Sequence, residues 1–208
     1  MAKLYFRYGA MNCGKSTALQ QVAYNYRERG MEVVIIKPIV DTKGGDKVVS
    51  RLGIEKEVDL SLNFSDNVRD RIHQYINEKG DIHCVLVDEA QFLKKSQVDQ
   101  LFALAVRDQI PVICYGLRTD FSMTGFEGSE RLLLLAHSIE ELKTICACGK
   151  KALLNGRKVD GEFVFEGNQI AIDQENNITY ESLCPHCYFE KKDRYDQQIC
   201  GIINDNNY

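Results

Sequence analysis

Residues 9–16, Gly-Ala-Met-Asn-Cys-Gly-Lys-Ser, match the pattern of a phosphate-binding loop, which is Gly, four residues, and then Gly-Lys-Ser/Thr. The two glycines allow a tight loop whose backbone N–H groups turn inward around an anion, and Lys15 reaches the terminal phosphates. The Ser16 hydroxyl is then placed to bind Mg²⁺, and the following helix directs its positive dipole end at the phosphates. An ordinary glycine-containing turn is the alternative. The pattern predicts that the chain binds a nucleoside triphosphate.

Two carboxylates, Asp88 and Glu89, follow an apolar run at 83–87. Ligands of open α/β sheets bind beyond the carboxyl ends of the strands, which places Asp88 near the Mg²⁺ held by Ser16, through a water of its hydration shell. Glu89 is then free to act as general base on an acceptor hydroxyl, or to orient a water if water is the acceptor. The alternative is that Asp88 and Glu89 are a solvated acidic pair at the end of a strand and have no catalytic role.

Four of the eight cysteines form two close pairs, Cys146-Ala-Cys148 and Cys184-Pro-His-Cys187. This spacing is typical of a four-thiolate zinc site in which each pair lies on one turn and the long gap holds a β-hairpin. A closed site of this kind is structural, and it supplies folding energy that a small lobe lacks. The alternatives are four buried reduced cysteines, or His186 as the fourth ligand.

The elements that position these groups follow from the hydrophobic pattern. Short apolar runs alternate with amphipathic segments, which predicts an α/β fold with a parallel sheet covered on both faces, as in phosphate-loop NTPases. Residues 42–53 are glycine-rich and polar, which predicts a loop. The predicted strands are 3–8, 33–37, 83–87 and 111–115, and the predicted helices are 16–29, 65–78 with Ser65 as N-cap, 96–108 and 130–137.

The pattern changes in the last third of the chain, where short β-like segments are punctuated by Gly and Asn. We therefore predict a phosphate-loop domain at 1–142 and a small zinc-binding, β-rich domain at 143–192. Residues 193–208 are polar, like the whole stretch from Glu190, and are predicted to be a poorly ordered tail.

The composition and net charge argue against some classes of function. The chain has 208 residues and a formal net charge of −4, which argues against a broad basic surface for nucleic acid. No apolar run reaches the roughly 18 residues that a membrane span requires, and the N-terminus lacks a signal-peptide pattern. We expect a cytoplasmic protein with no nucleic-acid or membrane partner, whose cysteines are reduced rather than disulfide-bonded.

Four aromatic residues lie close in sequence to the predicted site residues: Phe92, Phe121, Phe126 and Tyr180. Flat apolar faces of this kind are needed for one wall of a base-binding pocket. Taken one at a time, each is more typical of a core residue than of a ligand contact.

Taken together, these motifs resemble those of one family, the thymidine kinases that carry a zinc-bearing lasso domain, and among them the enterobacterial-type enzymes. The resemblance covers roughly residues 3–188, and its order and spacing are specific. It is carried by AMNCGKST at 10–17, VDEAQF at 87–92, YGLRTDF at 115–121, ELKTIC at 141–146 and YESLC at 180–184.

The resemblance implies ATP-dependent phosphorylation of the 5′-hydroxyl of thymidine in nucleotide salvage, with Glu89 as the catalytic base and deoxyuridine left open as a further acceptor. It also implies Mg²⁺ with ATP, structural Zn²⁺ on Cys146, Cys148, Cys184 and Cys187, feedback inhibition by dTTP, and a homotetramer. The residues predicted for ATP and Mg²⁺ are Gly9, Ala10, Met11, Asn12, Cys13, Gly14, Lys15, Ser16, Thr17, Asp88 and Gln91. Those predicted for the nucleoside are Phe92, Phe121, Phe126, Ile170, Ala171, Ile172, Asp173, Gln174 and Tyr180.

The chain departs from the family pattern at two places. Lys43 follows Asp41 and Thr42 where relatives carry an arginine, and a lysine does not reproduce a bidentate guanidinium contact. Asp173, Gln174 and the residues after them replace the glycine pair of the family's lasso.

Two rival functions stay open at the level of sequence. An ATP-driven nucleic-acid-binding protein would use the zinc lobe to grip a strand, but the segment 146–187 has only a modest basic cluster offset by acidic residues. A kinase acting on another nucleoside or on a monophosphate is the nearer rival. Monophosphate kinases need several arginines for the acceptor phosphate, and outside Arg118 and Arg131 the chain shows no such cluster.

Overall fold

The computed structural model describes residues 1–39, 47–49, 55–169 and 177–205, with side chains described except at 47–49, 55–57 and 201–205. Expectations for Lys43 and for lasso residues 170–174 therefore lie outside the described residues. The chain divides into two compact units. The first unit comprises Met1–Gly9, Gly14–Arg118 and Gly125–Leu142, and the second comprises Ala10–Cys13, Thr119–Thr124 and Lys143–Tyr208.

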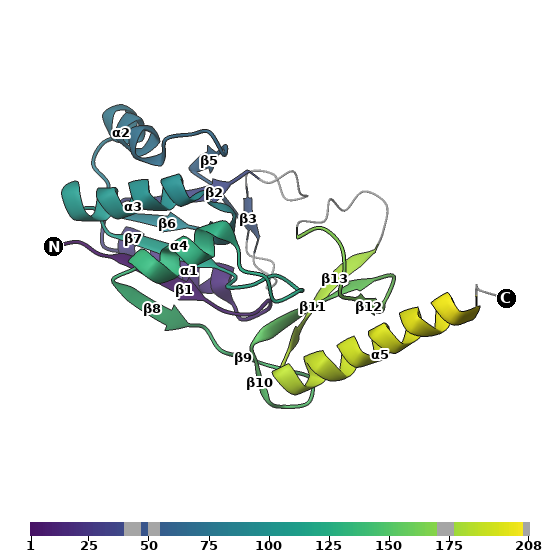
Figure 1. Cartoon of the computed structure of the whole chain (residues 1–208). Helices are drawn as coiled ribbons and strands as arrows, with labels where there is room; N and C mark the ends of the chain where they lie inside the picture. Colours follow the sequence, from purple (N-terminus) through teal and green to yellow (C-terminus); the bar gives the residue numbers. More distant parts are fainter. Residues whose placement is uncertain (40–46, 50–54, 170–176, 206–208) are drawn as a thin grey trace. The chain divides into compact units, whose positions relative to one another are not determined.

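The first unit is built on a six-stranded sheet in which every neighbouring pair of strands is parallel. Its order is β5-β2-β6-β7-β1-β8 (Figure 1). The strands are β1 (Leu4–Tyr8), β2 (Val33–Pro38), β5 (Leu60–Leu62), β6 (Cys84–Val87), β7 (Val112–Gly116) and β8 (Ser138–Glu141). The prediction of an α/β fold with a parallel sheet is confirmed.

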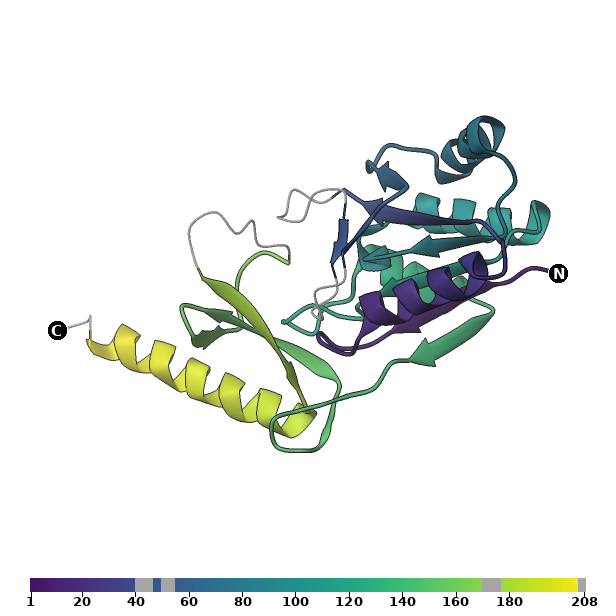
Figure 2. The same cartoon turned by 180° about the vertical axis from the view of Figure 1, so that it is seen from behind.

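Alternate residues of the central strands are buried on opposite faces of this sheet, because successive side chains of a strand point to opposite sides. Val34 and Ile36 join one apolar core, while Val33 and Ile35 join another. The helix α1 (Lys15–Arg27) covers the second core, and α2 (Val68–Lys79), α3 (Lys95–Arg107) and α4 (Glu127–Leu135) cover the first (Figure 1 and Figure 2). Burial on both faces explains why these strands are continuous apolar runs.

Two helices begin three residues away from their predicted starts, and the other two begin within one residue of theirs. The α2 helix begins at Val68 because Asn67, and not Ser65, is its N-cap: the Asn67 side-chain oxygen accepts hydrogen bonds from the backbone N–H groups of Arg69 and Asp70. The α4 helix begins at Glu127, one turn before the predicted start.

The sequence pattern also missed four strands of the first unit: β3, β4, β5 and β8. Strand β3 (Lys47–Val49), within the predicted loop 42–53, pairs antiparallel with β4 (Glu55–Glu57), which follows that loop. The edge strand β8 pairs with β1, but its sequence, Ser-Ile-Glu-Glu, is polar and largely exposed. An edge strand of this kind lacks the apolar run by which the central strands were predicted.

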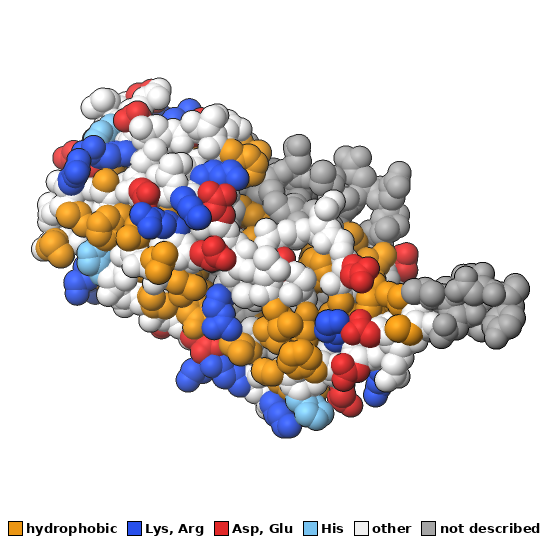
Figure 3. Space-filling model, viewed as in Figure 1, with side chains coloured by type: hydrophobic (Ala, Val, Ile, Leu, Met, Phe, Trp, Pro, Cys, Tyr) orange, Lys and Arg blue, Asp and Glu red, His pale blue; other side chains and the backbone are white. Residues whose placement is uncertain are grey.

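Ion pairs join the exposed sides of α3 and α4. The Lys94 ammonium lies 3.1 Å from the Glu127 carboxylate, and the Arg131 guanidinium lies 2.7 Å from Asp99. On the face shown in Figure 3, acidic and basic side chains are interspersed in the same way. Exposed pairs contribute little to stability, so the packing of α4 depends mainly on buried contacts.

The second unit contains a three-stranded antiparallel sheet in the order β12-β11-β13, the short hairpin β9–β10, and one long helix. Its apolar core includes Leu154, Phe165, Leu183 and Tyr188. The elements are β9 (Thr144–Ile145), β10 (Lys151–Ala152), β11 (Leu154–Val159), β12 (Glu162–Val164), β13 (Ile178–Leu183) and α5 (Pro185–Asp205).

The α5 helix differs from the poorly ordered tail that the sequence predicted from Glu190 onward. Tyr188 and Tyr195 are two turns apart on this helix, and their rings lie 5.2 and 5.6 Å from the ring of Phe165. The Lys192 and Asp196 side chains form an i,i+4 ion pair on the same helix. Anchoring aromatics in a largely polar segment therefore account for a helix where composition indicated disorder. Within the described part of the chain, no helix combines the length and the apolar character that a membrane crossing requires.

A bidentate ion pair joins α2 to the end of α3. The Arg69 Nε and Nη2 atoms each donate to a carboxylate oxygen of Asp108 at 2.7 Å, and the His73 Nε2 atom lies 3.2 Å from the same group. The hydrogen bond from Arg69, opposed by partial burial, lowers the pKa of Asp108. A lowered pKa stabilises the folded state above the pKa of an unfolded aspartate, about 3.9, and this contribution is lost as the pH falls through the folded value.

We therefore expect Asp108→Asn to lower the free energy of unfolding at pH 7, and the difference from the wild type to shrink as the pH falls below about 4. Urea unfolding followed by circular dichroism at a series of pH values measures this difference. Asp81→Asn, which makes the same change at an exposed site, is the control and should match the wild type. A difference for Asp108→Asn that is constant with pH would contradict the role of its charge.

Candidate active site

The phosphate loop, residues 9–16, connects β1 to α1. The Gly9 N–H donates to the Gly116 carbonyl at 3.3 Å, and the Lys15 ammonium donates back to the Gly9 carbonyl, also at 3.3 Å. Gly14 has φ 82°, a left-handed conformation that favours glycine, and is the N-cap of α1. Lys15, Ser16 and Thr17 then form the first turn of the helix, whose N–H groups have no partners within the helix. This arrangement is the one the motif predicted, and an anion is the ligand that it suits.

The middle of the loop, Ala10–Cys13, belongs to the second unit. Ala10 is buried, Met11 and Cys13 are half-buried, and Asn12 is exposed with φ 63°. The Met11 N–H donates to the Asn155 side-chain oxygen at 2.7 Å, and the Met11 carbonyl accepts from the Ser182 hydroxyl. Side chains of β11 and β13 thus hold the centre of the loop.

The acidic pair directly follows β6. Asp88 is 4% exposed, and its N–H donates to the Ile36 carbonyl of β2 at 2.9 Å. Burial, together with the neighbouring charge of Glu89, raises the pKa of Asp88 to about 7, and the Lys37 and Lys15 ammonium groups partly oppose this rise. Asp88 and the phosphate-loop lysine therefore share one electrostatic environment. A buried carboxylate of raised pKa is a group that a bound cation would stabilise in its charged form.

Glu89 is oriented by a buried amide. Glu89 is half-buried with φ 50°, and its carboxylate accepts a hydrogen bond from the Gln91 Nε2 group. The Gln91 Oε1 atom in turn accepts from the backbone N–H of Leu117 at 3.1 Å. Gln91 is 1% exposed, so its amide is held in place and bridges Glu89 and the residue after β7 by hydrogen bonds. The predicted contact of Gln91 with ATP or Mg²⁺ stays a prediction.

Two glycines, Gly116 and Gly128, leave space around Gln91 and the backbone next to it. A Cβ atom at Gly116 would lie 2.8 Å from the Gln91 Oε1 atom. At Gly128, on α4, a Cβ atom would lie 2.6 Å from the Ala90 carbonyl oxygen and 2.8 Å from that of Leu93. The absence of side chains at these positions lets β7 and α4 approach the short helix η1 (Ala90–Phe92), which follows Glu89. The position of Glu89 therefore depends on close backbone packing.

The predicted aromatic residues divide between the units. In the first unit, Phe92 and Phe126 meet edge to face with ring centroids 5.6 Å apart. Phe121 and Tyr180 belong to the second unit, where Phe121 is buried and Tyr180 is half-buried on β13. Their predicted contacts with a nucleoside stay predictions, and those of Ile170, Ala171, Ile172, Asp173 and Gln174 lie outside the described residues.

Phe121 lies in a loop, Thr119–Thr124, whose backbone is tied from several directions; we call it the aromatic loop. The Asp120 carboxylate accepts from the N–H groups of Ser122 and Thr124, both at 2.9 Å. The Tyr188 hydroxyl donates to the Phe121 carbonyl at 2.7 Å. These bonds make the aromatic loop a defined part of the second unit.

Arg157 joins the aromatic loop to the segment that follows β12 (Glu162–Val164). Its guanidinium carbon lies 3.7 Å from the centre of the Phe121 ring. Its two terminal nitrogens donate to the Glu166 and Asn168 carbonyls, both at 2.8 Å. A guanidinium both stacks on a ring and donates in its own plane, which a lysine cannot do.

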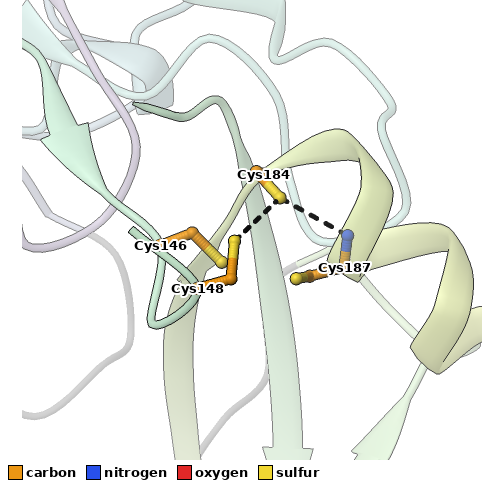
Figure 4. A group of neighbouring side chains, drawn as sticks. All are labelled: Cys146, Cys148, Cys184 and Cys187. Atoms are coloured by element: carbon orange, nitrogen blue, oxygen red, sulfur yellow. Dashed lines mark hydrogen bonds between the residues drawn. The ribbon is translucent and has the colours of Figure 1, made fainter. Parts of the chain in front are cut away.

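The four paired cysteines come together in the second unit. Cys146, Cys148, Cys184 and Cys187, the cysteine cluster, have sulfur atoms within 4.8 Å of one another and point toward a common centre (Figure 4). Cys146 and Cys148 lie on the β9–β10 turn, Cys184 follows β13, and Cys187 is in the first turn of α5. The Cys187 N–H donates to the Cys184 sulfur at 3.4 Å. Four converging sulfurs on two turns fit a tetrahedral structural zinc ion.

Ionisation of the cluster is favoured at two of its thiols. Burial opposes ionisation of Cys146, but backbone N–H groups of Cys148 and Cys184 outweigh it and lower its pKa to about 7. The Cys187 N–H lowers the pKa of Cys184. The side chain of Cys148, followed by that of Cys184, raises the pKa of Cys187 to about 12. A lowered pKa favours the thiolate form, which is the form of cysteine that binds a metal ion.

Sequence reasoning missed Asn155, Ser182, Arg157 and Tyr188. The only signal was a polar residue within an apolar strand, as at Asn155 after Leu153 and Leu154, where a strand disfavours asparagine. The partners of these side chains are distant in sequence, so no spacing pattern marks them.

A parallel sheet with a phosphate loop after β1 and an acidic pair after β6 has the architecture of a nucleoside-triphosphate-binding α/β protein. The comparisons with known proteins narrow this class. The family model described as "Thymidine kinase" matches residues 2–188. The chain is 50% identical over 188 residues to the thymidine kinase of Rhodopirellula baltica, covering 88% of this chain and 86% of that protein.

Two further relatives match over similar lengths. The thymidine kinase of Haemophilus influenzae is 50% identical over 193 residues, covering 92% of this chain and 98% of that protein. The thymidine kinase of Enterobacteria phage T4 is 48% identical over 186 residues, covering 88% of this chain and 94% of that protein. The chain belongs to the thymidine kinase family, which confirms the resemblance seen in its motifs.

The amide of Gln91 provides a first test of the site geometry. Gln91→Leu would leave the buried Leu117 N–H without its acceptor, and we expect a loss of about 1–3 kcal/mol in the free energy of unfolding. Urea unfolding measures this loss. Gln74→Leu makes the same change on the exposed side of α2 and should leave stability nearly unchanged. Equal free energies of unfolding for the two variants would show that the hydrogen bonds of the buried Gln91 amide do not stabilise the fold.

The cysteine cluster provides a second test. Cys184→Ser should lose bound zinc and the cooperative unfolding of the second unit, because metal binding supplies folding energy to a small lobe. Metal analysis of the purified protein measures zinc content, and near-UV circular dichroism follows the tyrosines packed against the cluster. Cys200→Ser, at an exposed cysteine of α5, is the control. A Cys184→Ser protein with full zinc content would contradict the assignment.

Proposed function

We propose that this protein transfers the γ-phosphoryl group of ATP to the 5′-hydroxyl of thymidine, producing dTMP and ADP for nucleotide salvage. The observation that carries the proposal is the position of Glu89. It follows β6, is oriented by Gln91, and shares the carboxyl edge of one parallel sheet with the phosphate loop. Membership of the thymidine kinase family supports the choice of nucleoside.

Glu89 is proposed as the general base. Its carboxylate accepts one hydrogen bond from Gln91, which leaves acceptor capacity for the proton of a substrate hydroxyl. The fixed amide orients the carboxylate before the substrate arrives, so little reorganisation is needed during proton transfer.

Lys15 and the first turn of α1 are proposed to bind the terminal phosphates. The Lys15 ammonium donates to the Gly9 carbonyl across the loop, and when ATP is bound it would donate to a phosphate oxygen. Mg²⁺, when bound with ATP, would neutralise charge on the phosphates, and Ser16 and Asp88 are the residues proposed to hold it. The raised pKa of Asp88 supports this role, because a buried carboxylate needs a cation to stay charged at neutral pH.

The nucleoside base is proposed to contact the predicted aromatic residues, and family membership supports this proposal. Phe92 and Phe126 supply one paired surface, and the Phe121 ring is held under the Arg157 guanidinium. Tyr180 lies directly opposite Arg157 in the β11–β13 register, and it precedes Cys184 by four residues. The lasso residues 170–174 are proposed to complete the site on the basis of the family alone.

The cysteine cluster is proposed to hold zinc, whose role here is structural. Strand β13 runs directly into Cys184, so a metal ion would anchor one end of the sheet that carries Asn155, Arg157 and Tyr180. Inhibition by dTTP, assembly into a homotetramer and a cytoplasmic location are part of the same proposal, and their support is family membership.

The decisive experiment is Mg²⁺-dependent phosphorylation across a panel of nucleosides and thymidine monophosphate. We expect selective turnover of thymidine, and a decrease of about 10²–10⁴-fold in kcat for Glu89→Gln with ATP binding retained. The variant should keep its shape because the glutamine carbonyl can still accept from Gln91. Comparable phosphorylation of every nucleoside, or of the monophosphate instead, would contradict the substrate assignment.

Glu78→Gln is the matched control, since it makes the same change on the exposed surface of α2. It should turn over thymidine at the wild-type rate. A Glu89→Gln enzyme as active as this control would eliminate Glu89 as the base.

A further inference from the structure

Two buried polar side chains face each other in the sheet of the second unit. Asn155 on β11 and Ser182 on β13 are directly opposite in the antiparallel register. They are 3% and 7% exposed, and their neighbours Leu154 and Leu183 belong to the apolar core. Burial of an amide and a hydroxyl beside such a core is unfavourable unless both are hydrogen-bonded. The hydrogen-bond partners of Asn155 and Ser182 therefore indicate why polar residues occupy these two buried positions.

Both side chains bind the same residue of the phosphate loop. The Asn155 Oδ1 atom accepts from the Met11 N–H at 2.7 Å, and the Ser182 hydroxyl donates to the Met11 carbonyl. The two backbone polar groups of Met11 are thus satisfied by one cross-strand pair. Residues this far apart in sequence, 144 between Met11 and Asn155, meet only through the fold.

Asn155 makes a second connection. Its Nδ2 group donates to the Thr119 carbonyl at 3.1 Å, at the start of the aromatic loop. A single amide therefore fixes the distance between the middle of the phosphate loop and the segment that carries Phe121. The Ser182 hydroxyl, by contrast, bonds only to the phosphate loop among the residues that the structure describes.

We propose that Asn155 and Ser182 are a positioning pair that holds the phosphate loop in its anion-binding conformation, and that Asn155 also sets the aromatic loop against it. The inference rests on the proposed role of residues 9–16 in binding ATP. A phosphate loop binds through backbone N–H groups, whose directions change with any rotation of its peptide planes. Fixing both polar groups of Met11 restricts that rotation before ATP binds.

The two residues should differ in their effects. Ser182→Ala removes one hydrogen bond to the loop, and we expect ATP binding to weaken about tenfold, the effect of one lost buried hydrogen bond. Asn155→Leu removes the bonds to both loops, and should weaken ATP binding at least as much while also raising the KM for thymidine. Ser182→Ala should leave the KM for thymidine nearly unchanged.

The experiment measures binding of Mg²⁺–ATP to the zinc-loaded full chain by titration calorimetry without nucleoside, and then the KM values for both substrates. Thr179→Val is the matched control, because it removes a hydroxyl from an exposed position of the same strand. It should bind ATP with wild-type affinity. Zinc content and the thermal transition of each variant are measured first, and Asn155→Ser replaces Asn155→Leu if the latter does not unfold cooperatively.

Unchanged ATP affinity in both Ser182→Ala and the Asn155 variant would overturn the proposal. Lower thermal stability with unchanged affinity at 25 °C would also overturn it, since the pair would then act only in folding. The binding measurement does not depend on turnover. A wild-type protein that binds ATP but phosphorylates no nucleoside would refute the proposed function and leave this inference standing.

Discussion

The parallel register of β6, β7 and β1 is the constraint on which the rest of the site depends. Val87 pairs with Cys114, and Gly116 pairs with Tyr8, so the three strands end at nearly the same level. In a parallel sheet the connections that follow must then leave from one edge. The phosphate loop, the acidic pair and the segment after β7 become neighbours for this reason, although long stretches of chain separate them.

Side-chain amides connect these backbone segments. Gln91 joins Glu89 to the Leu117 N–H, and Asn155 joins the Met11 N–H to the Thr119 carbonyl. An amide is suited to this task because it carries a donor and an acceptor on one rigid group. Each lies in a buried setting, where a hydrogen bond is stronger and its loss is more costly than in water. Two buried side-chain amides thus fix the backbone segments that they join.

The second unit, which carries the cysteine cluster, also helps to hold these loops. Its apolar core is small, and it includes Cys146 and Cys184 as well as Leu183 and Tyr188. A metal ion on the cysteines would stabilise the end of the β11–β13 sheet that carries the polar pair facing Met11. The second unit would then also support the loops that are proposed to bind substrates.

Much of the outline could be predicted from sequence. The alternation of apolar strands with helices predicted the parallel sheet. The spacing of the cysteines predicted that two pairs form one cluster, and the structure brings those four side chains together. Errors arose where the local pattern was weak. The polar edge strand β8 has no apolar run, and α5 continues past Glu190 because Tyr195 packs against Phe165. A composition rule cannot detect such a contact.

The sequence by itself determined which groups are candidates for chemistry, because each lies within a short motif: the phosphate loop, the acidic pair and the two cysteine pairs. Short motifs of this kind depend on the residue types and the backbone conformation of one turn. Both can be recognised from residues that are adjacent in the sequence. Only the tertiary structure decided what holds these groups in place. The bonds of Gln91 to Leu117 and of Asn155 and Ser182 to Met11 join positions from 26 to 171 residues apart. Such contacts form only when strands pair and helices pack.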